Sequence, residues 1–342
     1  MALARTSIGL CILLVLIEGC ARGQGTLFAR IDPPPVWPPP PDRPRIKFVG
    51  SLSGSHDLHA ARSGVEGLRA ALRGPRPPIN FVGPNAVATL PSGLVAVADG
   101  AGACVHVIDL DERTHMRISG WEDGRFALPI GVTWARERLF VTDAQRHEVI
   151  ELDPARGVVG RFGAGELLRP VGIAYVPRRD NLYVVDGGAH CIKVFDLSGA
   201  MVNVIGRQGT DKGAFNFPSH IACVGDRIAV ADTGNARVQS LDLDGACLNV
   251  VGRRGNAAGD LALPKGVAFD SEGHLYVVDA RFENVQVFDP AGRLLMVFGE
   301  EGDALGRFSL PAGISIDGRD WIWVADSGNH RVQVFAYLGM ES

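Results

Sequence analysis

Residues 326–335 read Asp326-Ser327-Gly328-Asn329-His330-Arg331-Val332-Gln333-Val334-Phe335, and this stretch decides the fold. A second copy stands at residues 232–239 as Asp232-Thr233-Gly234-Asn235-Ala236-Arg237-Val238-Gln239. In both copies a Gly-Asn turn separates an apolar segment that ends in Asp from a segment of alternating apolar and polar residues. Such alternation is typical of a β-strand with one buried face. The stretch therefore predicts two strands joined by a tight turn.

The apolar-x-Asp motif at the start of this stretch occurs six times along the chain. The six copies end at Asp99, Asp143, Asp186, Asp232, Asp279 and Asp326. A proline precedes each copy, at Pro84, Pro129, Pro170, Pro218, Pro264 and Pro311. Self-similarity with a period of roughly 40–50 residues is the sequence signature of a solenoid or a propeller. We therefore expect six copies of one structural unit.

Each unit is predicted to hold four short strands, which in the fifth copy cover residues 266–269, 275–278, 285–288 and 294–298. Glycine-containing turns separate these strands, as hairpins require. Six four-stranded units suit a closed ring, which leaves only short, protected sheet edges. The last copy lacks its fourth strand, and Arg45-Ile46-Lys47-Phe48-Val49-Gly50 resembles the missing one. The sequence thus predicts an all-β, six-bladed β-propeller over residues 80–338, closed by an N-terminal strand that pairs with residues 332–335.

These repeats resemble NHL repeats, over about three quarters of the chain and most clearly in the last four copies. The resemblance implies a propeller, and it implies that the arginine after the Gly-Asn turn is a routine part of the repeat. NHL domains of eukaryotic regulators bind single-stranded RNA, and related propellers hold metal-dependent lyase or lactonase sites in the central channel. The chain as a whole resembles the bacterial envelope lipoprotein type of NHL protein.

Residues 1–20 have the features of a signal peptide, because Arg5 precedes an apolar stretch that is too short to span a membrane. It ends in Leu16-Ile17-Glu18-Gly19-Cys20, which resembles a bacterial lipoprotein cleavage box with Cys20 as the lipidated residue. Ordinary secretion and an uncleaved anchor are the alternatives. In the lipoprotein reading, Ala21 favours the outer membrane over other parts of the envelope. The predicted location is the bacterial cell envelope, as an outer-membrane lipoprotein or in the periplasm, with secretion as the alternative.

Residues 21–44 are proline-rich and are predicted to form an extended tether, with a ligand for a proline-recognition module as the alternative. Residues 45–79 would hold the closing strand and one short helix. The helix is indicated by the capping-box spacing of Ser63 and Glu66.

The six repeated aspartates are predicted to fix turns, because one copy per blade would otherwise make six active sites. A loop-face binding set is the stronger candidate, since the loops that enter each blade and those that join its second and third strands share one face. Its members are Arg169, Arg207, Lys212, His220, Arg237, Arg253, Lys265 and Arg331. His220 replaces the glycine found at this place in four other repeats and is also a weak metal-ligand candidate. One histidine cannot supply the three or four protein ligands of a metal site, so no metal, cofactor or catalytic residue is assigned.

The 342 residues carry a net charge of −4. This balance and the expected export argue against nucleic acid as a partner. Cys104, Cys191, Cys223 and Cys247 fall outside the signal and are expected to be free thiols. The predicted function is an envelope-anchored scaffold that binds a protein, peptide or glycan through one loop face. The alternative is a metal-dependent lyase or lactonase-like enzyme, which would need channel residues such as His220 and Asn85.

Overall fold

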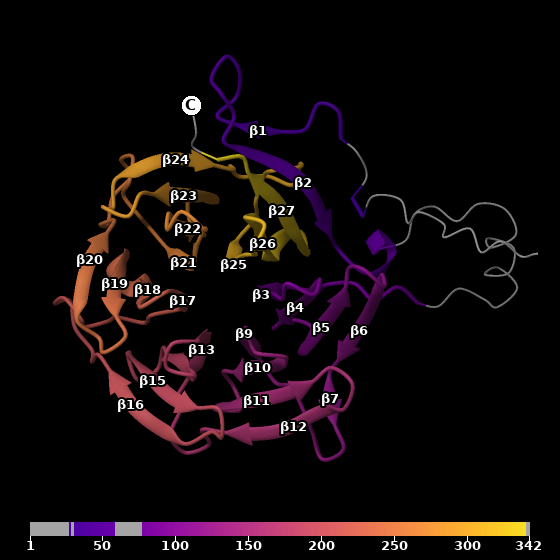
Figure 1. The fold of residues 1–342 in the computed structure, drawn as a ribbon, viewed down its shortest axis with the longest axis vertical. Coiled ribbons are helices and arrows are strands. Elements are labelled where there is room, and N and C mark those ends of the chain that lie inside the picture. The colour runs from indigo at the N-terminus through magenta and orange to yellow at the C-terminus, as the bar shows by residue number, and fades with distance from the viewer. Residues whose placement is uncertain (1–26, 29–30, 59–76, 340–342) are drawn as a thin grey trace, which may run out of the picture.

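The computed structural model describes residues 27–28, 31–58 and 77–339, which form a ring of six antiparallel sheets (Figure 1). Each blade begins with the strand nearest the central axis and ends with the strand at the rim. Blade 1 consists of β3 (Pro84–Thr89), β4 (Leu94–Asp99), β5 (Cys104–Asp109) and β6 (Thr114–Ile118). Blade 2 consists of β9 (Pro129–Ala135), β10 (Arg138–Asp143), β11 (Glu148–Asp153) and β12 (Gly157–Phe162). The short hairpin of β7 (Gly120–Trp121) and β8 (Gly124–Arg125) lies between these two blades.

The next three blades repeat the same order. Blade 3 consists of β13 (Pro170–Val176), β14 (Asn181–Asp186), β15 (Cys191–Asp196) and β16 (Met201–Ile205). Blade 4 consists of β17 (His220–Val224), β18 (Arg227–Asp232), β19 (Arg237–Asp242) and β20 (Cys247–Val251), with the 3-10 turn η2 (Thr233–Asn235) between its second and third strands. Blade 5 consists of β21 (Pro264–Phe269), β22 (Leu275–Asp279), β23 (Asn284–Phe288) and β24 (Leu294–Phe298).

Blade 6 is built from both ends of the described chain. It combines β25 (Pro311–Ile316), β26 (Trp321–Asp326) and β27 (Arg331–Tyr337) with the N-terminal strand β2 (Ile46–Leu52), and η3 (Ser327–Asn329) joins β26 to β27. The pairing of β2 with β27 sets Phe48 opposite Phe335 and Leu52 opposite Val332. The predicted six-bladed propeller and its closing strand are therefore confirmed.

The proline-rich segment differs from the expected extended tether over its described part, residues 31–44. There β1 (Val36–Trp37) pairs with β2 and adds a fifth strand to blade 6. The Trp37 ring lies 5.9 Å from the ring of Phe298 and 5.7 Å from that of Phe335. Partial burial of this aromatic side chain at the joint of blades 5 and 6 holds the segment on the propeller rather than away from it.

The short helix expected around Ser63 lies outside the described residues, and so does the whole signal segment with Cys20. The described chain has one 3-10 turn in this region, η1 (Ser55–Leu58). No helix within the described residues is both long and apolar enough to cross a membrane.

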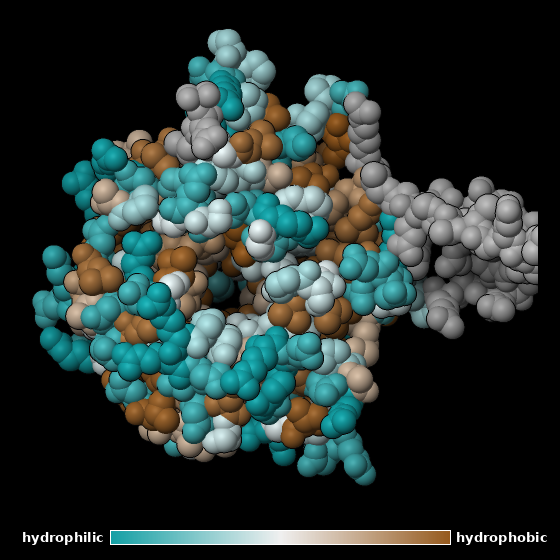
Figure 2. Space-filling model, in the orientation of Figure 1, coloured by the Kyte–Doolittle hydropathy of each residue, from teal (hydrophilic) through white to brown (hydrophobic). Residues whose placement is uncertain are grey.

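The core lies between the faces of neighbouring blades, because the alternating strands turn their apolar side chains toward the next sheet. Phe298, Phe308 and Phe335 are buried together with Phe48 in one such layer. The innermost strands approach each other through glycine: a Cβ added at Gly172 would lie 2.7 Å from the Cα of His220. These close contacts leave only a narrow hollow where the six inner strands meet, which Figure 2 shows at the centre of the face.

Candidate binding face

The repeated aspartates fix the loops of one face of the ring, and all six are fully buried. In blade 1 the Asp99 carboxylate accepts the backbone N–H groups of Val82 at 2.6 Å, Gly83 at 2.9 Å and Gly102 at 2.7 Å. The first two belong to the loop that enters the blade, and the third belongs to the turn after the second strand. The carboxylate therefore ties both loops together, and the predicted structural role of these residues is confirmed. We call the surface formed by these entry loops and turns the loop face.

Two of the predicted binding residues, Arg237 and Arg331, are internal. Arg237 donates from Nε to Asp232 at 2.7 Å and from Nη2 to the carbonyl oxygens of Asp211 and Ala214. Arg331 makes the same kind of contacts with Asp326 and the carbonyl oxygens of its own entry loop. These guanidinium groups donate their hydrogen bonds within the protein, and their membership in a partner-binding set stays a prediction.

Four of the predicted cations are exposed on the loop face. Arg207 pairs with Asp211 at 3.3 Å and Arg253 with Asp260 at 3.0 Å, and both arginine side chains remain largely in solvent. Arg169 and Lys212 are also exposed. Exposed pairs of this kind contribute at most about 1 kcal/mol to folding, which leaves these groups free to meet a partner.

Lys265 lies at the mouth of the channel, directly after the first residue of β21. Burial lowers the pKa of this half-buried ammonium group, and the positive charge of Arg169 lowers it further. Arg169 belongs to blade 3 and Lys265 to blade 5, so the two charges meet across the end of blade 4. The structure thus brings together two of the residues that the sequence assigned to binding.

His220 begins β17 at the same mouth. Its half-buried ring accepts the Val267 backbone N–H at Nδ1 over 3.4 Å, and burial lowers its pKa to about 4. The ring is therefore neutral at pH 7. Within the described residues one group of three His, Cys, Asp or Glu side chains has donor atoms within 4.8 Å of one another, and His220 is not a member.

That group lies inside blade 1 and was missed by the sequence analysis. Cys104 and His106 occupy the positions that Arg331 and Gln333 hold in blade 6. The Nε2 atom of His106 lies 3.3 Å from the Cys104 sulfur and 3.4 Å from the Asp99 carboxylate. Its Nδ1 atom lies 2.9 Å from Nε2 of His115.

Burial decides the character of this group. It raises the pKa of the Cys104 thiol to about 11. It also opposes ionisation of Asp99, but the hydrogen bonds from His106 and three backbone N–H groups hold the pKa of that carboxyl below its usual value. The thiol is neutral, the carboxylate already accepts several hydrogen bonds, and neither group has access to solvent. This group is therefore an internal hydrogen-bond network. Cys104, Cys191, Cys223 and Cys247 are all free thiols in the structure.

A set of exposed apolar residues on the loop face was also missed. Each lies one or two positions before a repeated proline: Val82, Leu168, Phe217, Leu263 and Leu310, exposed by 49%, 60%, 56%, 37% and 60%. The signal was present in the sequence, as an apolar residue recurring at a fixed place in the repeat. We call these five residues the apolar set.

The preceding blade holds four of these residues in place. The ring of His147 contacts the backbone oxygen of Leu168 in the next blade, and the ring of His330 contacts the backbone oxygen of Val82 in the same way. The Phe217 N–H donates to Nδ1 of His190 at 3.0 Å. The Leu310 N–H donates to Glu283 at 3.3 Å. These links fix the backbone of the apolar set although its side chains are exposed.

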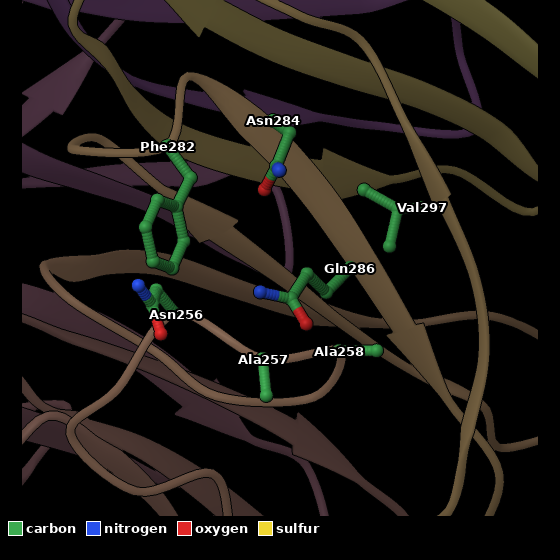
Figure 3. A pocket seen from close by; sticks show the side chains of 7 residues that line it. All are labelled: Asn256, Ala257, Ala258, Phe282, Asn284, Gln286 and Val297. Atoms are coloured by element: carbon green, nitrogen blue, oxygen red, sulfur yellow. The ribbon is translucent and has the colours of Figure 1, made fainter.

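A pocket of about 300 Å³ opens in blade 5 (Figure 3). Its lining consists of Asn256, Ala257, Ala258, Phe282, Asn284, Gln286 and Val297. Figure 3 shows the Phe282 ring and the Asn256 and Gln286 amides converging on one space, with Asn284 pointing into it from β23.

Comparison with known proteins agrees with this architecture. The chain is a six-bladed all-β propeller, and the family model described as NHL repeat matches two of its segments, residues 167–195 and 308–335, which fall in blades 3 and 6. The chain is 31% identical to NHL repeat-containing protein 2 of Bos taurus over 33% of its own length. It covers 22% of that protein, so it corresponds to about a fifth of the relative.

Solved structures show the same fold at low identity. An auxiliary nutrient binding protein from Bacteroides thetaiotaomicron gives a TM-score of 0.60 at 15% identity, with 76% of this chain and 70% of that chain covered. Virginiamycin B lyase from Staphylococcus aureus gives a TM-score of 0.56 at 14% identity, with 75% and 96% covered. Likeness at this level concerns the fold, and function has to be argued from the loop face itself.

Proposed function

We propose that this protein is an envelope-anchored scaffold whose loop face binds a partner protein or peptide. The observation that carries the proposal is the exposed apolar set, two of whose members, Leu168 and Leu263, stand one and two positions before the cationic residues Arg169 and Lys265. These residues recur at the same place in five of the six blades, so a partner that covers the loop face would bury several of them at once. Aromatic and arginine side chains such as Phe217 and Arg169 are the residue types that dominate binding energy at such sites.

The charge of this face favours an acidic partner segment. Burial lowers the pKa of Lys265, and the positive charge of Arg169 across the mouth lowers it further. A carboxylate placed between them would relieve the repulsion of the two charges. A partner that presents an apolar side chain next to an acidic one would fit both features.

Photo-crosslinking in the source organism tests this function. A photoreactive amino acid replaces Phe217 on the loop face, and the matched control replaces Val159, which is 49% exposed on the rim strand β12. We expect a crosslinked partner from position 217 that disappears when Arg169 and Lys265 are both changed to Glu. Equal crosslinking from both positions, or none from position 217, would reject the proposal.

The proposed location rests on residues 1–20 and on Cys20, as the sequence suggests. Fractionation of the same cells tests it. The wild-type protein should sediment with membranes, and the Cys20→Ser variant should not. Identical fractionation of the two would remove the lipid anchor from the proposal and leave the binding face unaffected.

A further inference from the structure

The pocket in blade 5 lies where blades 4 and 6 each carry an internal arginine. In those blades the arginine is the residue paired with the aspartate at the end of the second strand: Arg237 opposite Asp232, and Arg331 opposite Asp326. In blade 5 the residue paired with Asp279 is Asn284. The shorter side chain leaves the space of a guanidinium group unfilled, and Asn284 lines the resulting pocket.

The groups that receive the guanidinium are also repeated in blade 5. Isolated bridges align the three entry loops, joining Gln208 to Phe215, Arg254 to Leu261 and Glu301 to Phe308. In blade 6, Arg331 donates to the carbonyl oxygens of residues 303, 304 and 307. By this alignment their counterparts in blade 5 are residues 256, 257 and 260, of which the first two line the pocket.

Acceptor atoms at the pocket lack partners. The side chain of Gln286 is only 3% exposed. Neither its Oε1 atom nor the Oδ1 atom of Asn284 has a hydrogen-bond partner. The equivalent Oε1 atoms of Gln239 and Gln333 each accept a backbone N–H at 2.9 Å. Within the described residues Asp279 has no cationic partner, whereas Asp186, Asp232 and Asp326 each have one. Buried acceptors without donors are costly, so a donor-rich ligand would be stabilised here.

We propose that this pocket binds a guanidinium group, the side chain of an arginine supplied by the partner. A planar guanidinium presents five donors in a fork, which suits the several acceptors of the pocket better than a compact, strongly hydrated ammonium does. The Phe282 ring offers a face on which the guanidinium can stack. The exposed Arg253 beside the loop is already paired with Asp260 at 3.0 Å.

The origin of the arginine rests on the proposed function, because a partner docked on the loop face would present it. The pocket itself can be tested without any partner. Binding of Nα-acetyl-arginine methylamide to the full chain is measured by calorimetry and compared with the citrulline analogue, which has the same shape without the charge. We expect arginine to bind at least about ten-fold more tightly than citrulline, because bonds to a charged donor are roughly twice as strong as neutral ones.

The decisive variant is Asn284→Arg, which would fill the pocket from within as Arg237 and Arg331 fill theirs. We expect it to abolish arginine binding and to raise Tm by roughly 2–4 °C. The matched control is Asn203→Arg on the rim strand β16, which adds the same charge elsewhere and should leave binding unchanged.

Equal affinity for arginine and citrulline, or arginine binding by Asn284→Arg at the wild-type level, would overturn the inference. Crosslinking from position 217 would then still support the binding face. Conversely, arginine binding without any crosslinked partner would keep the pocket and reject the proposed function.

Discussion

Blades 1 and 6 build the same turn with different chemistry. In blade 6 Asp326 is bound by Arg331, Gln333 and Asn329. In blade 1 Asp99 has Cys104 and His106 at the first two of these positions, and the nearby arginine, Arg117, comes from the neighbouring strand and donates to the Cys104 sulfur at 3.2 Å. Both aspartates nevertheless accept the N–H groups of their entry loops. The carboxylate is thus the fixed part of the repeat, and the group beside it can be exchanged.

Removal of the aspartate carboxylate should have the largest effect in both blades. We expect Asp99→Ala and Asp326→Ala each to lower the free energy of unfolding by about 3–5 kcal/mol, because each leaves buried donors without an acceptor. Urea denaturation measures both losses. The matched control is Asp109→Ala, which removes hydrogen bonds to Asp111 and Glu112 at an exposed turn and should cost about 1 kcal/mol. A loss at one blade much smaller than at the other would show that the aspartate is not the shared element.

Loss of the arginine near the aspartate should destabilise blade 6 more than blade 1. Arg331→Met leaves the buried Asp326 without its cation and removes a donor from each of three carbonyl oxygens, so we expect a loss of about 2–4 kcal/mol. Arg117→Met removes an exposed guanidinium that contacts Cys104 and Gly102, and should cost less than about 1 kcal/mol. The midpoints of urea unfolding compare the two variants directly. Equal losses would mean that blade 1 depends on its cation as blade 6 does.

The sequence was sufficient for the architecture because the evidence is local and repeated. Alternating apolar residues set each strand, and six copies of the Asp motif reveal the period whatever the neighbours of any one copy are. The closing strand could be predicted for the same reason, since residues 45–50 resemble the fourth strand of the fifth copy, residues 294–299.

The site depended on contacts between distant residues, which spacing does not reveal. Arg237 and Arg331 look like surface charges in the sequence, because nothing there shows the carbonyl oxygens that surround them. His115 reaches His106 because the β5–β6 hairpin sets it opposite Ile108, and that register depends on the exact turn. The blade 5 pocket is indicated in the sequence by one residue, Asn284, which stands where two other repeats have arginine.

The histidine network gives blade 1 a pH dependence of its own, and its effect is the smallest of the three. Burial and the nearby His106 lower the pKa of His115 to about 4. The folded protein therefore keeps this ring neutral, while the unfolded chain takes up a proton as the pH falls through its ordinary value of about 6.5. The contribution of His115 to the free energy of unfolding is therefore fully present above about pH 6.5. It decreases as the pH falls toward 4 and does not change further below that pH. At pH 5 the loss is roughly 1–2 kcal/mol.

His115→Gln should reduce this slope, because the amide can contact His106 without titrating. The measurement is the urea midpoint at a series of pH values between 4 and 7. Part of the slope should remain in the variant, since burial also lowers the pKa of His220 in blade 4 to about 4. His56→Gln is the matched control, because that side chain is 59% exposed on η1 and lies outside the network. An unchanged slope in His115→Gln would show that the two histidines of blade 1 do not carry the acid sensitivity that separates this blade from blade 6.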